Sequence, residues 1–175
     1  MLGEIMRRLL NVSRERQLEL ESLFPWLHSV HGNDNTTARM LSVSVFDHWL
    51  TREEACAQLE DVPTEEQHRR NALHTTLCAR IARETEVLSF VFRRRQRDRL
   101  VFRGFASSAP LCAYFSPNGG KTLRHRQFHV VLPELRCAFY EGWDDTNHFY
   151  FSEGTQINRI VDWVTESGLH ILEKT

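Results

Sequence analysis

The spacing of hydrophobic positions changes about halfway along the chain, from a helical period to a strand period. In the first half, apolar residues recur every three or four positions, notably over residues 2–10 and 13–24. Two capping boxes, at Thr51–Glu54 and Thr64–Gln67, each place a hydroxyl three residues before a carboxylate or amide. The pattern therefore predicts a mainly helical region over residues 1–85.

The second half consists of short runs rich in aromatic and β-branched residues, separated by turn-forming residues. Strands that follow one another without helices between them favour an antiparallel meander. The runs fall within residues 86–152 and read VLSFVFR, RLVFRGF, LCAYFS, RQFHVVL, LRCAFYE and HFYFS.

The C-terminal segment returns to the helical period. A helix is predicted from about Thr155, and Gly168 stands where a glycine commonly ends a helix. Residues 169–172 then predict a last strand. The apolar stripe of this helix comprises Ile157, Ile160, Val161 and Val164.

Helices first and strands later are typical of the α+β class. We predict one domain over residues 1–175, in which N-terminal helices pack on a curved antiparallel meander sheet of five or six strands. Residues 153–175 add the C-terminal helix and the terminal strand. Residues 38–50 stay open between strand and helix, because their apolar positions fit both periods.

Composition narrows the class of protein. The 175 residues are 41% hydrophobic and carry a net charge of −1, which excludes an intrinsically disordered chain and a chain that coats nucleic acid over its whole surface. The four cysteines form no C-x-x-C pair, and no run approaches the length of a signal peptide core or a membrane span. We expect a cytoplasmic protein with reduced thiols, no membrane contact and no cofactor.

The small net charge hides a strong segregation. Residues 1–90 carry −4, residues 91–136 carry +8, and residues 137–175 carry −5. The central excess falls on predicted strands and turns, so these arginines could form a basic surface on the sheet. The predicted ligand-binding residues are Arg93, Arg95, Arg103, Arg124, Arg126, Trp143 and Tyr140.

This segregation favours a non-enzymatic binding protein that presents a basic, aromatic-bearing sheet surface to an acidic protein or another anionic ligand. Nucleic acid is the less favoured partner, because no recognised nucleic-acid-binding signature is present. The alternative interpretation is that these arginines pair with the acidic helices, which would require no ligand.

A second hypothesis concerns the two histidines of the segment His125–His129. On a strand they would lie about 13 Å apart, which is too far to bind one metal ion, so no metal site is predicted. With Arg124 and Arg126, either histidine could serve a metal-independent phosphodiesterase or ribonuclease-like enzyme as a general base. The alternative is a half-exposed structural histidine.

The loop over residues 140–148 also concentrates reactive groups. Asp144, Asp145 and His148 are the further candidate catalytic residues, because a carboxylate beside an imidazole can perform acid–base chemistry. The alternative is a hairpin connection in which Asp145 forms a turn and Trp143 covers the end of the sheet.

Aromatic residues of the strand half exceed what one layer of helices can cover. The surplus would either line an apolar pocket that binds a small molecule or form a subunit interface. We prefer the interface, and we therefore predict a homodimer.

Overall fold

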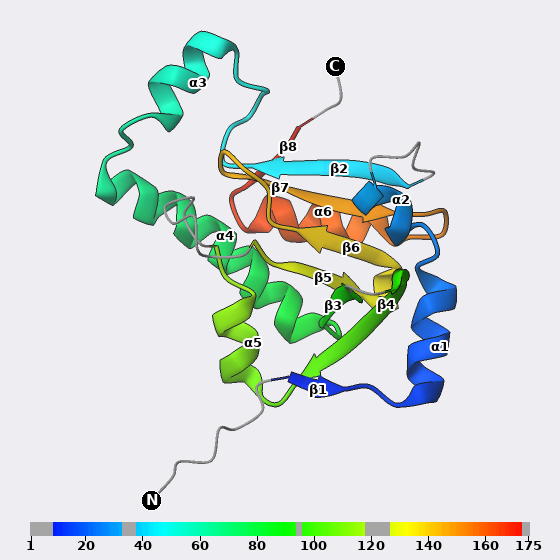
Figure 1. Ribbon diagram of the computed structural model, residues 1–175. Coiled ribbons are helices and arrows are strands. Elements are labelled where there is room, and N and C mark those ends of the chain that lie inside the picture. Colours follow the sequence, from blue (N-terminus) through cyan, green and yellow to red (C-terminus); the bar gives the residue numbers. More distant parts are fainter. Residues whose placement is uncertain (1–8, 33–37, 94–95, 118–126, 173–175) are drawn as a thin grey trace, which may run out of the picture.

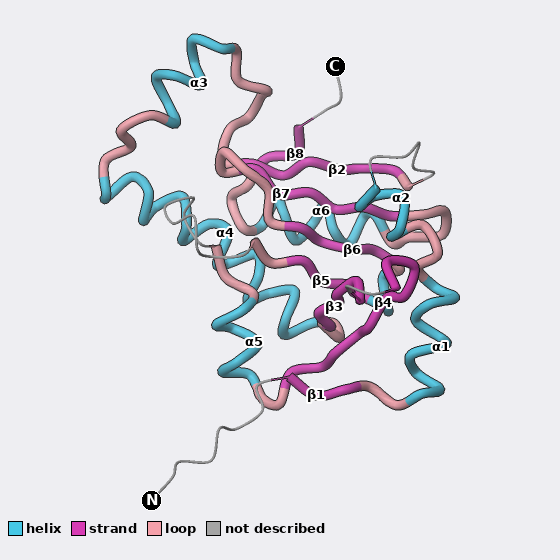
Figure 2. Tube along the Cα trace, viewed as in Figure 1, coloured by secondary structure: helices cyan, strands magenta, loops and turns pink. Residues whose placement is uncertain are grey.

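The computed structural model describes residues 9–32, 38–93, 96–117 and 127–172, and these form one antiparallel sheet with helices on both faces (Figures 1 and 2). The predicted α+β class is confirmed, and the described residues form eight strands rather than the expected five or six. The elements in chain order are β1 (Leu9–Asn11), α1 (Arg14–Leu23), α2 (Leu27–Gly32), β2 (Arg39–Ser44), α3 (Arg52–Leu59), α4 (Thr64–Glu84), β3 (Leu88–Arg93), β4 (Gln96–Phe105), α5 (Ser108–Tyr114), β5 (His129–Leu132), η1 (Pro133–Leu135), β6 (Cys137–Tyr140), β7 (Thr146–Phe151), α6 (Ile157–Glu166) and β8 (His170–Leu172).

The strand order is β1-β4-β3-β5-β6-β7-β2-β8, so β1 and β8 form the two edges. The strands β5, β6 and β7 follow one another as the predicted meander. The hairpin β3–β4 extends it on one side, where β1 pairs with β4. On the other side β2 lies between β7 and β8. The first and the last strand of the chain, β1 and β8, therefore belong to the same sheet, at opposite edges.

The helices α4 and α6 cover one face of the meander. Leu77 and Ile81 of α4 and Trp163 of α6 are fully buried against Phe139 and Phe149 of the sheet. Each large apolar side chain buried in this way contributes about 1.5–3 kcal/mol to folding. The Trp163 indole also donates a hydrogen bond to a Glu84 carboxylate at 2.9 Å, which joins the two helices.

The helices α1 and α2 cover part of the opposite face. Leu20, Phe24 and Leu27 have no exposed surface and belong to a second core with Phe90 and Phe102 of the sheet. The surplus of aromatic residues therefore has a second helix layer to cover it. This layer removes the premise from which the subunit interface was predicted.

Helix and strand boundaries follow local signals in several places. The Ser13 hydroxyl accepts a hydrogen bond from the Arg16 backbone at 3.1 Å and so begins α1, while the capping box at Thr51 and Glu54 begins α3. Gly168 has a φ of +75° just after α6 and ends it as predicted.

The predicted strand over residues 111–116 is wrong, because residues 111–114 belong to α5 and the next two follow its end. Its apolar run fits a strand and a short helix equally well, and the Pro110 that precedes it is typical of a turn. Proline is tolerated in the first turn of a helix, where a backbone N–H has no helical partner. Pro110 occupies such a position two residues after the first residue of α5.

At two further places the boundaries differ from the prediction, and at a third the structure decides between strand and helix. Residues 9–11 form a strand rather than the end of a helix, and the remainder of that predicted helix lies outside the described residues. Thr64 is the first residue of α4 instead of its cap, which is Pro63. The open segment over residues 38–50 contains β2, with Val43 buried and both Ser42 and Ser44 facing packed neighbours.

Candidate functional site

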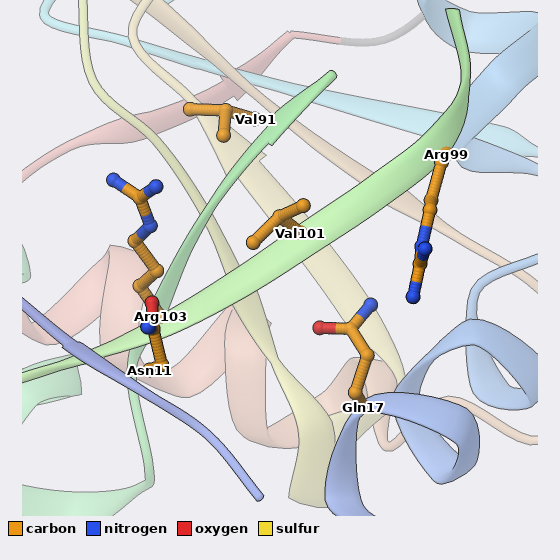
Figure 3. A pocket seen from close by; sticks show the side chains of 6 residues that line it. All are labelled: Asn11, Gln17, Val91, Arg99, Val101 and Arg103. Carbon is orange, nitrogen blue, oxygen red and sulfur yellow. The ribbon is translucent and has the colours of Figure 1, made fainter. Parts of the chain in front are cut away.

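A hollow of about 250 Å³ lies over the β3–β4 hairpin, beside the point where β1 ends (Figure 3). It is the strongest candidate for a binding site in the part of the chain that we describe, because cationic and apolar side chains meet there. The residues that line it are Asn11, Gln17, Val91, Arg99, Val101 and Arg103.

Strand geometry places the two arginines and a valine on one face of β4. Side chains alternate along a strand, so Arg99, Val101 and Arg103 point to the same side. Val91 of β3 pairs directly with Val101 and completes an apolar floor between the arginines. The floor lies open, since Val91 is 38% exposed.

Gln17 of α1 forms the rim of the hollow at the sheet edge. Its carboxamide oxygen accepts a hydrogen bond from the Phe102 backbone N–H at 3.0 Å, and its nitrogen donates to the Leu100 carbonyl at 2.9 Å. These are bonds that a neighbouring strand would make, so the side chain continues the pairing of β4 beyond Asn11, where β1 ends. The hollow therefore has a fixed wall.

Arg99 and Arg103 differ from most of the arginines of the helices. Among the side chains that the structure describes, which exclude those of residues 93 and 96–98, neither has a carboxylate at ion-pair distance, and the buried Nε atom of Arg103 has no hydrogen-bond partner. The arginines that do pair with carboxylates are Arg16, Arg69, Arg70, Arg80, Arg83 and Arg159. For the two strand arginines, the expected pairing with acidic helices is thus not found among the described residues.

The predicted ligand-binding residues do not all meet at this hollow. Arg103 lines it, whereas Tyr140 lies on the opposite face of the sheet and Trp143 is 73% exposed in the β6–β7 turn. Arg93 ends β3, and we describe only its backbone. The remaining predicted ligands, Arg95, Arg124 and Arg126, lie outside the described residues, as does the candidate catalytic residue His125.

Sequence reasoning missed the other lining residues. Arg99 was counted in the basic segment, and its spacing from Arg103 was a usable signal for a shared face. Asn11 and Gln17 carried no such signal, because their contacts with β4 span more than 80 positions of the chain.

The two described histidine candidates lie in one row across the opposite face. Strand register aligns His129 with Tyr140, Tyr140 with His148, and His148 with Ser42. The rings of His129 and Tyr140 stack with centroids 5.9 Å apart. Neighbouring strands are about 4.8 Å apart, so the two histidines stand about 10 Å from each other, with a tyrosine between them.

Hydrogen bonds hold both rings in place. The Nε2 atom of His129 lies 2.8 Å from the Phe90 carbonyl, which only accepts, so this nitrogen carries the hydrogen. The Nδ1 atom of His148 lies 3.0 Å from the Ser42 hydroxyl, and burial lowers the pKa of His148. Burial, with smaller effects of Tyr150 and Tyr114, raises the pKa of Tyr140.

Asp145 does not join this row. Its carboxylate accepts hydrogen bonds from Gln67 at 3.1 Å and from Arg70 at 3.0 Å, both on α4. It therefore faces the α4 side of the sheet, whereas His148 faces the other side. Asp144 is exposed in the turn, where it and Asp145 have positive φ values of 58° and 54°.

The described ranges contain neither a cluster of metal ligands nor a membrane-spanning helix. No three His, Cys, Asp or Glu side chains are grouped so that they could hold a metal ion. Of the helices that we describe, none combines the length and the apolar character needed to cross a membrane. Comparisons of the chain with protein-family models, curated proteins and solved structures found no match.

Proposed function

We propose that the protein is a non-enzymatic binding protein that holds an anionic group in the hollow over β3 and β4. Arg99 and Arg103 together offer ten N–H donors and no acceptor, and none of the described side chains brings a carboxylate to either. Donors without acceptors suit a carboxylate or a phosphate, which arginine binds with paired, charge-assisted hydrogen bonds. The lack of a carboxylate partner for these two arginines among the side chains that the structure describes is the observation that carries the proposal.

A titration with fluorescein-labelled polyglutamate, followed by fluorescence anisotropy at low salt, tests the proposal. We expect the double variant Arg99→Glu and Arg103→Glu to weaken binding at least about tenfold. The matched control is Arg52→Glu on α3, which changes an exposed arginine that has no carboxylate partner among the described residues. An equal loss in the control, or no binding by the unchanged protein, would overturn the proposal.

Self-association is a separate proposal. A homodimer is supported by the edge position of β1 and by Leu10 on that strand, which is 49% exposed. Antiparallel pairing of β1 with its copy about a twofold axis would continue the sheet. Light scattering checks this directly, and a monomer at all concentrations would contradict it.

We also propose a reducing, cytoplasmic location. All four cysteines are free thiols, and burial raises the pKa of Cys78 and of Cys137. Free thiols are typical of reducing compartments. In a reducing location the protein should carry no intramolecular or mixed disulfide in cells. Alkylation followed by mass spectrometry measures this.

A further inference from the structure

We infer that the natural ligand of the hollow is an extended acidic peptide, with two carboxylate side chains four positions apart and an aliphatic side chain midway between them. The inference rests on the proposed function and deepens it, because it names the arrangement of the anionic groups. Three features of the hollow carry it: the spacing of the arginines, the floor between them, and the absence of aromatic rings from its lining.

The spacing of Arg99 and Arg103 matches that of an extended chain. They are separated by four positions of β4, which corresponds to about 14 Å at 3.4 Å per residue. A peptide lying along β4 in an extended conformation has the same rise. Its side chains at alternate positions therefore fall over Arg99, Val101 and Arg103 in turn.

The two guanidinium groups do not converge on one point. Figure 3 shows Arg103 extending on the Val91 side of the hollow and Arg99 extending on the Gln17 side. The Val91–Val101 pair lies between them. One small anion cannot contact both groups in this arrangement, whereas a ligand with two separated carboxylates can.

The floor selects what lies between the carboxylates. Val91 is exposed and Val101 is half-buried, so covering these two aliphatic side chains with a third removes apolar surface from water. A central leucine, isoleucine or valine in the ligand would do this. A serine in the same place would leave the two valines exposed to solvent.

The same lining distinguishes a peptide from single-stranded nucleic acid. Proteins that bind a single strand combine cations with aromatic side chains on which the bases stack. None of the six lining residues is aromatic. The hollow could contact phosphates but would offer no ring to a base.

The test uses fluorescein-labelled peptides and fluorescence anisotropy. The matched peptide contains Glu-Ser-Leu-Ser-Glu flanked by serines, a scrambled peptide of the same composition places the two glutamates side by side, and a third replaces the leucine with serine. Labelled oligothymidylate is the nucleic-acid probe. We expect the matched peptide to bind at least about tenfold tighter than the other three probes.

A charge reversal supplies the control for folding. The variant carrying Arg99→Glu and Arg103→Glu should lose the matched peptide and gain affinity for the same peptide with lysines in place of glutamates. Binding of that lysine peptide shows that the variant is folded. The Arg52→Glu control should behave as the unchanged protein does.

The outcomes separate the inference from the proposed function. If polyglutamate binds through both arginines but the scrambled peptide binds as well as the matched one, the inference fails and the proposed function stands. If oligothymidylate binds more tightly than the matched peptide, the ligand is a nucleic acid and the inference fails. If no anionic probe binds, both fail.

Discussion

The Arg70 guanidinium donates a hydrogen bond to a carboxylate oxygen of Asp145 at 3.0 Å, and this pair joins α4 to the turn between β6 and β7. Both groups are withdrawn from water, since the Arg70 side chain is 4% exposed and that of Asp145 is 13% exposed. The carboxylate that the sequence made a candidate for catalysis is therefore engaged in joining a helix to the sheet.

Replacing Asp145 with asparagine should destabilise the fold. The change removes the negative charge of one of the two carboxylates that pair with the buried Arg70 guanidinium, the other being Glu66. We expect it to cost about 2 kcal/mol of the free energy of unfolding. Asparagine tolerates the positive φ at this position, so backbone strain does not contribute. Urea denaturation measures the loss.

The neighbouring Asp144 provides the matched control. It also has a positive φ, but its side chain is exposed. Asp144→Asn should change the free energy of unfolding by less than about 0.5 kcal/mol. Equal effects of the two substitutions would show that the Arg70–Asp145 pair does not stabilise the fold.

The alternation of side chains along a strand already predicts that Asp145 and His148 lie on opposite faces of the sheet. Positions 145 and 147 fall on one face of the hairpin and position 148 on the other, so Asp145 and His148 were not placed for a shared site. Their closeness in sequence is what suggested a shared site. In a strand, side chains at odd and even positions point to opposite faces, so residues close in sequence need not share a site.

His74 should make the free energy of unfolding depend on pH, with greater stability at higher pH. Its Nε2 lies 3.1 Å from the Asp145 carbonyl and its Nδ1 lies 3.2 Å from the Asn147 amide nitrogen. The carbonyl only accepts and the amide nitrogen only donates, so the ring is neutral with its hydrogen on Nε2. Burial lowers the pKa of His74 below 6.5, and this effect outweighs the opposite effect of the hydrogen bond with the Asp145 carbonyl.

Unfolding therefore takes up a proton at His74 when the pH lies between its lowered folded-state pKa and the ordinary value of 6.5. The stability that this adds is fully present above pH 6.5, and it falls as the pH decreases below that value. The slope from one such group is at most about 1.4 kcal/mol per pH unit. Urea denaturation at pH 7.5 and at pH 5.5 measures it.

The substitution His74→Gln should flatten this slope, although it also lowers stability at neutral pH. The control His68→Gln changes an exposed histidine of the same helix and should leave the slope as it is. A slope that survives in His74→Gln would assign the pH dependence to another group. His148 is the next candidate, because burial also lowers its pKa.

The two strand arginines should contribute little to stability if they serve a ligand. Arg103→Gln removes a side chain with no carboxylate partner among the described residues, so we expect a change within about 0.5 kcal/mol. Arg70→Gln should cost about 3 kcal/mol, because it leaves Asp145 without its cation. Thermal denaturation compares the two, and a large loss for Arg103→Gln would make that arginine structural.

How far this site could be found from sequence depends on which contacts are local. Charge counting located the basic segment, and strand alternation could have placed Arg99 and Arg103 on one face. No local signal relates Gln17 to β4, because their contacts join residues more than 80 positions apart. The sheet edge that Gln17 covers exists only once β1 and β4 have paired.

Gln17→Met should expose that edge. Methionine keeps the approximate volume of the side chain and removes both hydrogen bonds to β4, which costs about 1–2 kcal/mol. An unpaired strand edge also favours association with other chains. We expect a lower denaturation midpoint together with concentration-dependent aggregation, whereas Leu18→Ala, which changes a 59% exposed residue of α1, should show neither.

Gly142 is held at its position by a steric requirement. A Cβ there would lie 2.1 Å from the Thr146 carbonyl oxygen and 3.0 Å from the Nε2 atom of His148, so the hairpin would have to open. At Gly104 a Cβ would meet only a Leu88 methyl group, at 3.8 Å. Gly142→Ala should therefore cost about 2 kcal/mol in urea denaturation. Gly104→Ala should leave the free energy of unfolding nearly unchanged. Equal costs of the two substitutions would contradict a steric requirement for glycine at position 142.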